Sequence, residues 1–417
     1  RRLTDRIDAV VTHRVFGTAT LVLVLGAVFQ AIYAWSVPLM DLVESVFAGA
    51  ATVVTNVVPE GPLQSLLVDG VIGGVGGIMV FLPQIMVLFL FLSLLEDCGY
   101  MSRAAFPMDK RLVRLGLSGN SVIPLLSSFA CAVPGIMAAR TIESPKNRIA
   151  TIVVAPLMSC SARLPVYVLL IGAFVPERAF LGGWVGLQGL TLFAAHLIGL
   201  LVAIPVLLVL KHTFFKGPAA PFVMELPPYR FPVWRNVVAR LWEQTHHFMV
   251  RAGTIILAVS VVIWALSYFP RPEAIHDRYE AQRLAAETAE ERAALDAEES
   301  GTYLRQSFLG RMGRLVEPVV EPLGWDWRVG MAVIGSFAAR EVVIATMGTI
   351  FNVGDAEADS AGLVDRLQRA RWPDGRPLFT LPVALSLIVF FALCCQCAST
   401  LAVIKRETAS WFWTGFT

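Results

Sequence analysis

Three cysteines stand in strongly apolar surroundings, and together they could bind a soft metal ion. They are Cys131, Cys160 and Cys397, and Met158 adds a thioether two residues before the second of them. Thiolate and thioether sulfur suit Fe(II), Cu(I) or Zn(II), whereas alkali and alkaline-earth ions prefer oxygen ligands. Cysteine is also a common small filler of apolar cores. Each thiol alone is therefore weak support for a metal pathway, and the three together are stronger support.

Residues that interrupt helices surround the first two of these cysteines. Pro134 and Gly135 follow the first, and Pro156 and Pro165 flank the second. A helix in lipid must satisfy its own backbone polar groups, so an interruption is tolerated only where the released carbonyls face protein or a cavity. These residues therefore predict helices that are interrupted around a transported ion or small solute.

Few ionisable residues lie inside the apolar runs, where one charge costs about 2.5–3.5 kcal/mol at the bilayer midplane. They are Arg163, Arg340 and Glu341. Glu341 could coordinate a cation or pair with Arg163, and the sequence leaves both possibilities open. Glu96 and Asp97 lie at an expected cytoplasmic helix end, where they could attract cations at the entrance or exit of a pathway, or cap the helix.

The composition is that of a polytopic membrane protein. Of 417 residues, 56% are hydrophobic and only 16% are charged, against about 25% charged in soluble domains. A net charge of +2 gives no reason to expect nucleic acid as a partner. The six cysteines show no regular pairing, which favours reduced thiols. The sequence contains no P-loop motif, which excludes nucleotide hydrolysis by that route.

Eight apolar runs exceed the roughly 18 residues that a membrane-spanning helix needs. Lys and Arg gather in cytoplasmic loops, so we expect the arm 1–14, residues 96–114 and the basic linker 211–251 to be cytoplasmic. Residues 41–69 contain neither Lys nor Arg and should lie outside. The runs are Val15–Met40, Val71–Leu95, Leu115–Ala139, Ile149–Pro176, Leu181–Leu210, Ala252–Pro270, Val329–Gly354 and Pro377–Ile404.

The run 115–139 has basic residues on both sides, so a full crossing would place one basic group outside. We interpret it as a re-entrant hairpin that turns at Pro124 or at 133–135; an ordinary span with misleading loop charge is the alternative. The remaining loops then lie on the sides that their charges predict only if the run 329–354 is also re-entrant, entering from the outside.

An internal repeat supports this symmetry. Gly116 and Gly324 are 208 residues apart, as are Phe129 and Phe337, each inside a matching short motif. An odd number of spans between the two copies makes the repeats inverted, which is an architecture of secondary transporters.

We therefore expect an all-α membrane fold with two gate repeats. The first, within 15–210, has hairpin 115–139 and broken helix 149–176; the second, within 315–417, has hairpin 329–354 and broken helix 377–404. A transmembrane helix at 252–270 and a charged, soluble helical insertion at 271–314 lie between them. Because the chain starts without Met and ends in apolar sequence, we expect a fragment of a longer protein.

Seven motifs resemble the FeoB ferrous-iron transporter family over nearly the whole chain. The resemblance implies a multi-pass protein of the bacterial inner membrane with a cytoplasmic N-terminus. It implies Fe(II) as the transported substrate, gates like those of nucleoside transporters, and the three cysteines as pathway residues. The motifs are Phe81–Gln84, Leu95–Phe106, Cys131–Met137, Arg140–Glu143, Ala155–Tyr167, Ala339–Val343 and Lys405–Thr408.

The same resemblance implies partners that this chain does not contain. These are an N-terminal G domain that binds GTP and Mg, small cytoplasmic accessory Feo proteins, and further copies in a homo-oligomer. Any GTPase activity would belong to the G domain, and this chain itself would be a transporter rather than an enzyme.

Two other classes of function remain to be weighed. A transporter of nucleosides or other organic solutes would need amide side chains in the hairpins, where Asn and Gln are scarce. A membrane redox enzyme could use Cys394, Cys395 and Cys397, but no catalytic base stands at a compatible spacing. Fe(II) transport therefore explains more of the sequence than either alternative.

Overall fold

The computed structural model is almost entirely helical; the strands β1 (Ala179–Phe180) and β2 (Val185–Gly186) form one short antiparallel pair. In that pair Ala179 lies opposite Gly186, and Phe180 lies opposite Val185. The residues that the structure describes are 3–13, 15–59, 61–103, 117, 119–160, 163–180, 185–215, 228–285, 288–337, 342–351, 360–372 and 374–417.

The chain divides into two compact units. The first unit comprises Arg1–Cys160, Leu200–Ala258 and Ser399–Thr417, and the second comprises Ser161–Gly199 and Val259–Ala398. Two of the boundaries fall just after Cys160 and just after Ala398. The chain therefore passes from one unit to the other at both of the interrupted helices that bear thiols.

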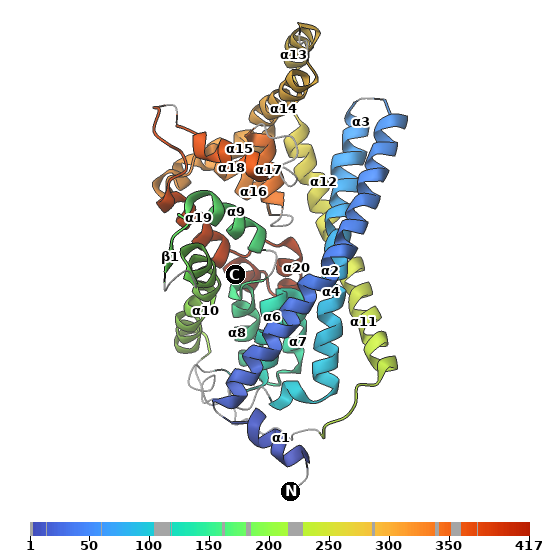
Figure 1. Ribbon diagram of the computed structural model, residues 1–417, viewed down its shortest axis with the longest axis vertical. Helices are drawn as coiled ribbons and strands as arrows, with labels where there is room; N and C mark the ends of the chain where they lie inside the picture. Colours follow the sequence, from blue (N-terminus) through green and yellow to red (C-terminus); the bar gives the residue numbers. More distant parts are fainter. Residues whose placement is uncertain are drawn as a thin grey trace. The chain divides into compact units, whose positions relative to one another are not determined.

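Most helices of the first unit belong to long apolar hairpins or to short segments around Cys131. Figure 1 shows α2, α4 and α11 side by side, and α4 contacts both of the others. The elements are α1 (Leu3–Val11), α2 (Phe16–Val57), α3 (Pro62–Ser65), π-helix η1 (Leu66–Ile72), α4 (Gly73–Asp97), η2 (Gly119–Ser121), α6 (Val122–Ala130), α7 (Ala132–Ala138), η3 (Ala139–Thr141), α8 (Pro145–Val154), η4 (Ala155–Leu157), α11 (Trp234–Phe248), π-helix η7 (Met249–Gly253), α20 (Ala398–Thr408) and α21 (Trp411–Phe416).

The second unit contains the later helices and α9. Two helices cross the unit boundary in their interior, α10 (Leu187–Thr213) and α12 (Thr254–Tyr268), and α20 has its first residue, Ala398, in the second unit. The remaining elements are α9 (Leu164–Phe174), α13 (Glu273–Ala285), α14 (Ala289–Gln306), α15 (Phe308–Val320), η8 (Glu321–Leu323), α16 (Trp327–Gly335), α17 (Val342–Ile350), α18 (Ser360–Arg369) and α19 (Leu381–Leu393).

Among the described residues, four helical stretches are long and apolar enough to cross a membrane. Large apolar side chains such as Phe193 and Leu201 on α10 are exposed, as expected for surfaces that face lipid. The four stretches are Phe16–Val57, Pro62–Asp97, Leu187–Thr213 and Leu381–Thr408; two shorter apolar helices are Leu164–Phe174 and Thr254–Tyr268.

Two helices extend well beyond the runs predicted from hydropathy. Helix α2 continues to Val57 and has 42 residues, which at about 1.5 Å per residue is roughly twice the hydrocarbon thickness. Much of 41–69 is thus helical rather than loop, because α2 keeps packing on α4 and η1. Likewise α11 occupies 234–248 within the expected linker 211–251 and continues through η7 into α12.

The insertion expected at 271–314 contains two charged helices, α13 and α14. Thr288 and Glu291 form a reciprocal capping box at the start of α14, which satisfies two backbone N–H groups. Arg283 of α13 pairs with both Asp296 and Glu299 of α14. Together with the hydrogen bond between the buried Tyr279 and Thr302, these ion pairs join the two helices.

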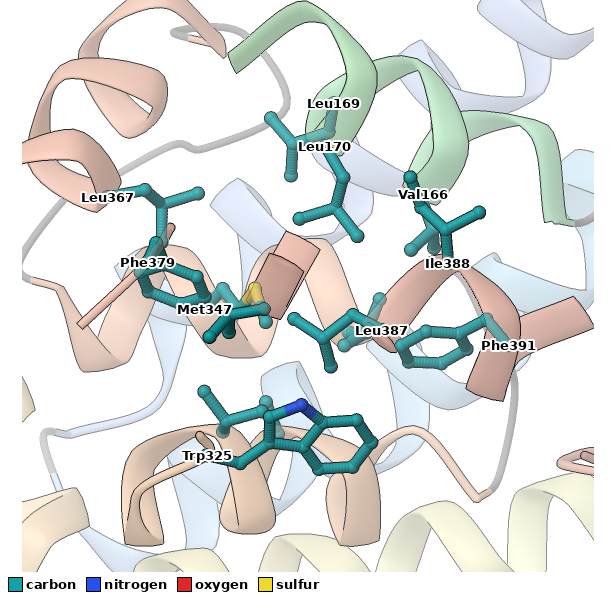
Figure 2. Close-up of a cluster of buried hydrophobic side chains, with 14 of the residues drawn as sticks. Val166, Leu169, Leu170, Trp325, Met347, Leu367, Phe379, Leu387, Ile388 and Phe391 are labelled. Atoms are coloured by element: carbon teal, nitrogen blue, oxygen red, sulfur yellow. The ribbon is translucent and has the colours of Figure 1, made fainter. Parts of the chain in front are cut away.

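The core of the second unit joins α9, α16, α17, α18 and α19. Figure 2 shows Val166 and Leu170 of α9 above Leu387 and Phe391 of α19, with Trp325 on the opposite side. The Trp325 indole N–H donates to the Ser386 hydroxyl at 2.8 Å, so this buried polar group is satisfied.

The first unit has a smaller buried cluster, which likewise joins a hairpin to one half of each broken helix. Ile136 and Ala139 follow the Cys131 interruption, Ile152 belongs to α8, and Ile404 belongs to α20; all four are buried in one cluster. Each unit thus combines one helical hairpin, the first half of one broken helix and the second half of the other. This matching composition supports the internal repeat.

The N-terminal arm is attached by one polar cluster. Arg103, which is only 3% exposed, donates to Asp8 of α1 at 2.6 Å, and the Tyr229 hydroxyl donates to the same carboxylate oxygen at 2.8 Å. The guanidinium also lies over the Tyr229 ring. Hydrogen bonding to Arg103 lowers the pKa of Asp8 below its usual 3.8, and burial together with the bond to Asp8 raises the pKa of Tyr229 to about 12.

We predict that Asp8→Asn lowers the thermal unfolding midpoint of the purified protein at neutral pH. Since the folded-state pKa of Asp8 is depressed, its contribution is present above the unfolded-state pKa and is lost as pH falls through the folded-state pKa. The difference between wild type and variant in thermal scans should therefore shrink in acid. Asp365→Asn, which removes an exposed pair with Arg369, is the control; equal effects of the two variants would contradict the prediction.

Candidate functional site

A helical hairpin carries Cys131 at its turn. Helix α6 ends at Ala130, Cys131 is extended (φ −155°, ψ 133°), and α7 starts at Ala132 and packs back on α6. We expected the turn at Pro124 or at 133–135, but both prolines are the third residues of their helices. Proline fits a first turn, where no N–H is needed, but its ring clashes with the carbonyl four residues earlier. Pro134 thus prevents a continuous helix through Ala130.

Gly135 allows the two helices of this hairpin to approach closely. A Cβ atom at Gly135 would lie 1.9 Å from the Ser128 hydroxyl and 2.6 Å from the Pro124 carbonyl oxygen. The Ser128 hydroxyl could rotate away from such a Cβ, whereas the Pro124 carbonyl oxygen belongs to the backbone and cannot. Only glycine therefore fits at this position.

The half-buried Cys131 packs against the apolar cluster of Val28, Ile32 and Leu88, from α2 and α4. This contact agrees with a role as a small apolar filler. The backbone of Cys131 is extended and changes the direction of the chain, while its N–H donates to the Ser127 carbonyl at 3.1 Å and its carbonyl accepts from the Gly135 N–H at 3.5 Å.

The first broken helix is interrupted around Cys160. Helix α8 tightens into the 3₁₀ turn η4 at Pro156, Met158 is extended, and α9 begins at Leu164 with Pro165 as its second residue. Cys160 is half-buried. Met158 is 3% exposed within an apolar cluster of the first unit, so the structure places its thioether in a core rather than at an open site.

Arg163 lies at the start of α9 and is 1% exposed. Its Nη2 is 3.5 Å from the Cys394 carbonyl oxygen, a long hydrogen bond within the second unit. A buried guanidinium therefore joins the end of the first interruption to the second one, which the sequence alone did not indicate.

The second hairpin consists of α16 and α17. A Cβ at Gly335 would lie 3.4 Å from the Thr346 hydroxyl oxygen, which shows how closely α17 packs on the end of α16. By the 208-residue offset of the repeat, Cys131 corresponds to Ala339. Arg340 and Glu341, which we predicted as gate and ligand residues, lie outside the described residues.

The second broken helix is interrupted over Cys394–Cys397, between α19 and α20. Its three cysteines are half-buried. Gln396 between them is buried and bonds to Val333 and Ser336 of the second hairpin. Sequence reasoning missed Gln396, although a lone amide among cysteines in an apolar run was a visible signal.

The proposed ligands are distributed over both units. Cys131 and Cys160 belong to the first unit and Cys397 to the second. Within the described part of the chain, no three His, Cys, Asp or Glu side chains lie close enough to hold a metal ion. All six cysteines are described, and none forms a disulfide.

Glu96 and Asp97 at the end of α4 have structural partners. Asp97 accepts the N–H of Val233 at 3.0 Å, where α11 begins, and Glu96 lies 3.4 Å from Arg240 of α11. These contacts fix α11 to α4, which favours the helix-capping interpretation of this acidic pair over that of a cation entrance.

Two helical hairpins and two interrupted helices define an all-α polytopic membrane domain with paired gates. The chain matches the Gate family model, described as nucleoside recognition, over residues 78–174 and 249–411. These ranges contain both hairpins and both broken helices. A second model, described as ferrous iron transport protein B C terminus, matches residues 192–244.

Curated relatives cover the whole chain. It is 41% identical over 415 residues to the Fe(2+) transporter FeoB of Leptospira interrogans, covering 100% of this chain and 57% of the relative. The Staphylococcus aureus Fe(2+) transporter FeoB is 38% identical over 417 residues, covering 98% of this chain and 56% of the relative. A Porphyromonas gingivalis Fe(2+) transport protein A/Fe(2+) transporter FeoB fusion protein is 42% identical over 426 residues. The match covers 100% of this chain and 49% of the relative.

The chain spans about half the length of the curated relatives that it matches. No solved structure matches it. The chain belongs to the FeoB family and represents that family's membrane region with its two gates.

We predict that Gly135→Ala destabilises the first hairpin. The added methyl group meets the Pro124 carbonyl, and overpacking of this kind costs about 1–3 kcal/mol, more than the helix propensity that alanine gains. The thermal midpoint, followed by tryptophan fluorescence, should fall by several degrees. Gly26→Ala in α2, where a Cβ would have open space, should leave the midpoint unchanged or raise it. A midpoint of Gly135→Ala at or above that of wild type would contradict the described packing.

Proposed function

We propose that this chain forms the membrane pathway of a ferrous-iron transporter, with Fe(II) as its substrate. The observation that carries the proposal is the position of three thiols at three backbone interruptions: Cys131, Cys160 and Cys397. The names of the curated relatives support the identity of the metal.

The interruptions suit a cation for a physical reason beyond sulfur chemistry. Cys131 follows the end of α6, Cys160 follows η4, and Cys397 follows α19. The C-terminal end of a helix carries partial negative charge on carbonyls that have no partner within the helix. Near Cys131 and Cys160, carbonyl oxygens at these helix ends are proposed to replace part of the hydration shell of Fe(II) during passage, whereas Cys397 lies directly before α20.

The remaining predicted residues take different parts in this proposal. Pro134, Gly135, Pro156 and Pro165 shape the interruptions, and Arg163 joins two of them. Glu341, which follows Arg340 in the sequence, is proposed as an additional oxygen ligand. Met158 remains a proposed thioether ligand two residues before Cys160, with its side chain packed in an apolar cluster.

The longer relatives suggest what accompanies this region. We propose that the whole protein has an N-terminal G domain that binds GTP and Mg, and that the arm at Asp8 faces the cytoplasm in a bacterial inner membrane. One relative is fused to an Fe(2+) transport protein A, which supports a small accessory Feo protein as a partner. The chain itself is proposed to transport rather than to catalyse, with GTPase activity confined to the G domain and with homo-oligomers as the assembled form.

Nucleoside transport is the second candidate, because the Gate model is described as nucleoside recognition. A nucleoside would need amide or carboxylate groups to bind its base and ribose. The amide of Gln396 at the second interruption is already bonded to the second hairpin, which favours a metal over an organic solute.

We predict that Cys131→Ser, Cys160→Ser and Cys397→Ser each lower the initial rate of Fe(II) uptake. The full-length protein would be reconstituted in liposomes and assayed without oxygen. Replacing sulfur by a hydroxyl removes the soft ligand, and a loss of at least about tenfold is expected from the effects of altered metal shells. Cys98→Ser, at the end of α4 and outside the interruptions, should keep the wild-type rate.

Wild-type uptake in all three variants would refute the ligand assignment. Uptake of radiolabelled uridine by wild type, with no uptake of Fe(II), would support the nucleoside transporter instead.

A further inference from the structure

One amide side chain connects the second interruption to the second hairpin. Gln396 is 7% exposed, and its Nε2 donates to the Val333 carbonyl at 3.2 Å. The Ser336 hydroxyl lies 2.8 Å from the same carbonyl and 3.4 Å from Gln396 Oε1. Val333 is in the last turn of α16 and Ser336 directly follows it, so Gln396 joins a broken helix to a hairpin.

Among the described residues, no backbone N–H donates to the Val333 carbonyl that Gln396 binds. The last carbonyls of a helix lack partners within it. At the end of α16 the Ser336 N–H donates to the Ala332 carbonyl, and the Phe337 N–H donates to the Ile334 carbonyl. Neither N–H donates to the Val333 carbonyl. Gln396 and Ser336 therefore act as the C-terminal cap of α16. The buried Val333 carbonyl thus has two side-chain donors, and Gln396 is the one that reaches it from the second interruption.

The first repeat is built differently at the matching positions. Ser128 corresponds to Ser336 by the 208-residue offset, and its hydroxyl donates to Pro124 within its own helix at 2.7 Å. In the second repeat the amide residue Gln396 directly precedes Cys397. In the first repeat the residue directly before Cys160 is Ser159, which has no amide. Among the described residues, the amide bridge is thus found in the second repeat and not at the matching positions of the first.

We propose that Gln396 is a positioning residue that sets where the Cys397 thiol stands relative to the second hairpin. This inference rests on the proposed function, in which Cys397 is a ligand of the transported metal. The interrupted segment is held at Cys394 by Arg163 and at Gln396 by α16, and Cys397 follows directly. Any movement of the second hairpin therefore moves the thiol with it.

The test measures the alkylation rate of Cys397 in the full-length protein in liposomes, resolved by mass spectrometry on the native cysteines. Gln396→Met keeps the side-chain length and removes the amide. It should raise the rate of Cys397 alkylation about three- to tenfold, the factor that corresponds to one net hydrogen bond. Gln396→Glu, which keeps the acceptor but lacks the N–H donor, should act in the same direction. Ser336→Ala should give a smaller increase, and Ser336→Thr should behave as wild type.

Gln368→Met is the matched control, because it removes an amide-to-carbonyl bond between α18 and Ala173 in the same unit. It should leave the Cys397 rate unchanged. Equal rates in Gln396→Met, Gln368→Met and wild type would overturn the proposal. If Gln396→Met does not fold, as judged by gel filtration, an unchanged Cys397 rate in Ser336→Ala would overturn it.

Fe(II) uptake measured on the same liposomes separates this inference from the proposed function. Loss of uptake in Gln396→Met together with faster alkylation supports both. Absence of Fe(II) uptake in wild type refutes the proposed function, and the alkylation rates then overturn or support the bridge on their own.

Discussion

The need to satisfy every backbone carbonyl inside a membrane governs this structure. Three helices end within apolar sequence, after Ala130, Leu157 and Leu393, where water is not at hand to bond the carbonyls. Buried side chains satisfy part of this demand, as the bond of Ser128 to the Pro124 carbonyl and the bond of Gln396 to the Val333 carbonyl show. In the proposed function, the carbonyls and thiols at these interruptions would suit a cation that has shed some of its water.

The arrangement of the two units follows from the same interruptions. Each unit takes its own hairpin, the first half of its own broken helix and the second half of the other, so the chain changes unit just after Cys160 and just after Ala398. At these two positions the division coincides with an interruption, whereas α10 and α12 cross the unit boundary as continuous helices. The interruptions thus serve the fold and the proposed pathway together.

Much of this fold could be predicted from the sequence because its signals are local. Apolar runs predicted the membrane helices, and Pro156 and Pro165 predicted the break around Cys160. We missed the exact turn at Cys131 because a proline interrupts a helix a few residues before the proline, and not at the proline itself. The length of α2 and the helix at 234–248 depend on packing against α4, and the partners of Gln396 lie 60 and 63 residues away; no local pattern shows such contacts.

X-ray absorption at the iron edge tests the central claim most directly. The full-length protein, loaded with Fe(II) without oxygen, should show sulfur in the first coordination shell. That sulfur shell should disappear when Cys131, Cys160 and Cys397 are all replaced by serine, and it should persist in Cys98→Ser. A first shell of oxygen and nitrogen alone in the wild-type protein would contradict a pathway lined by thiols.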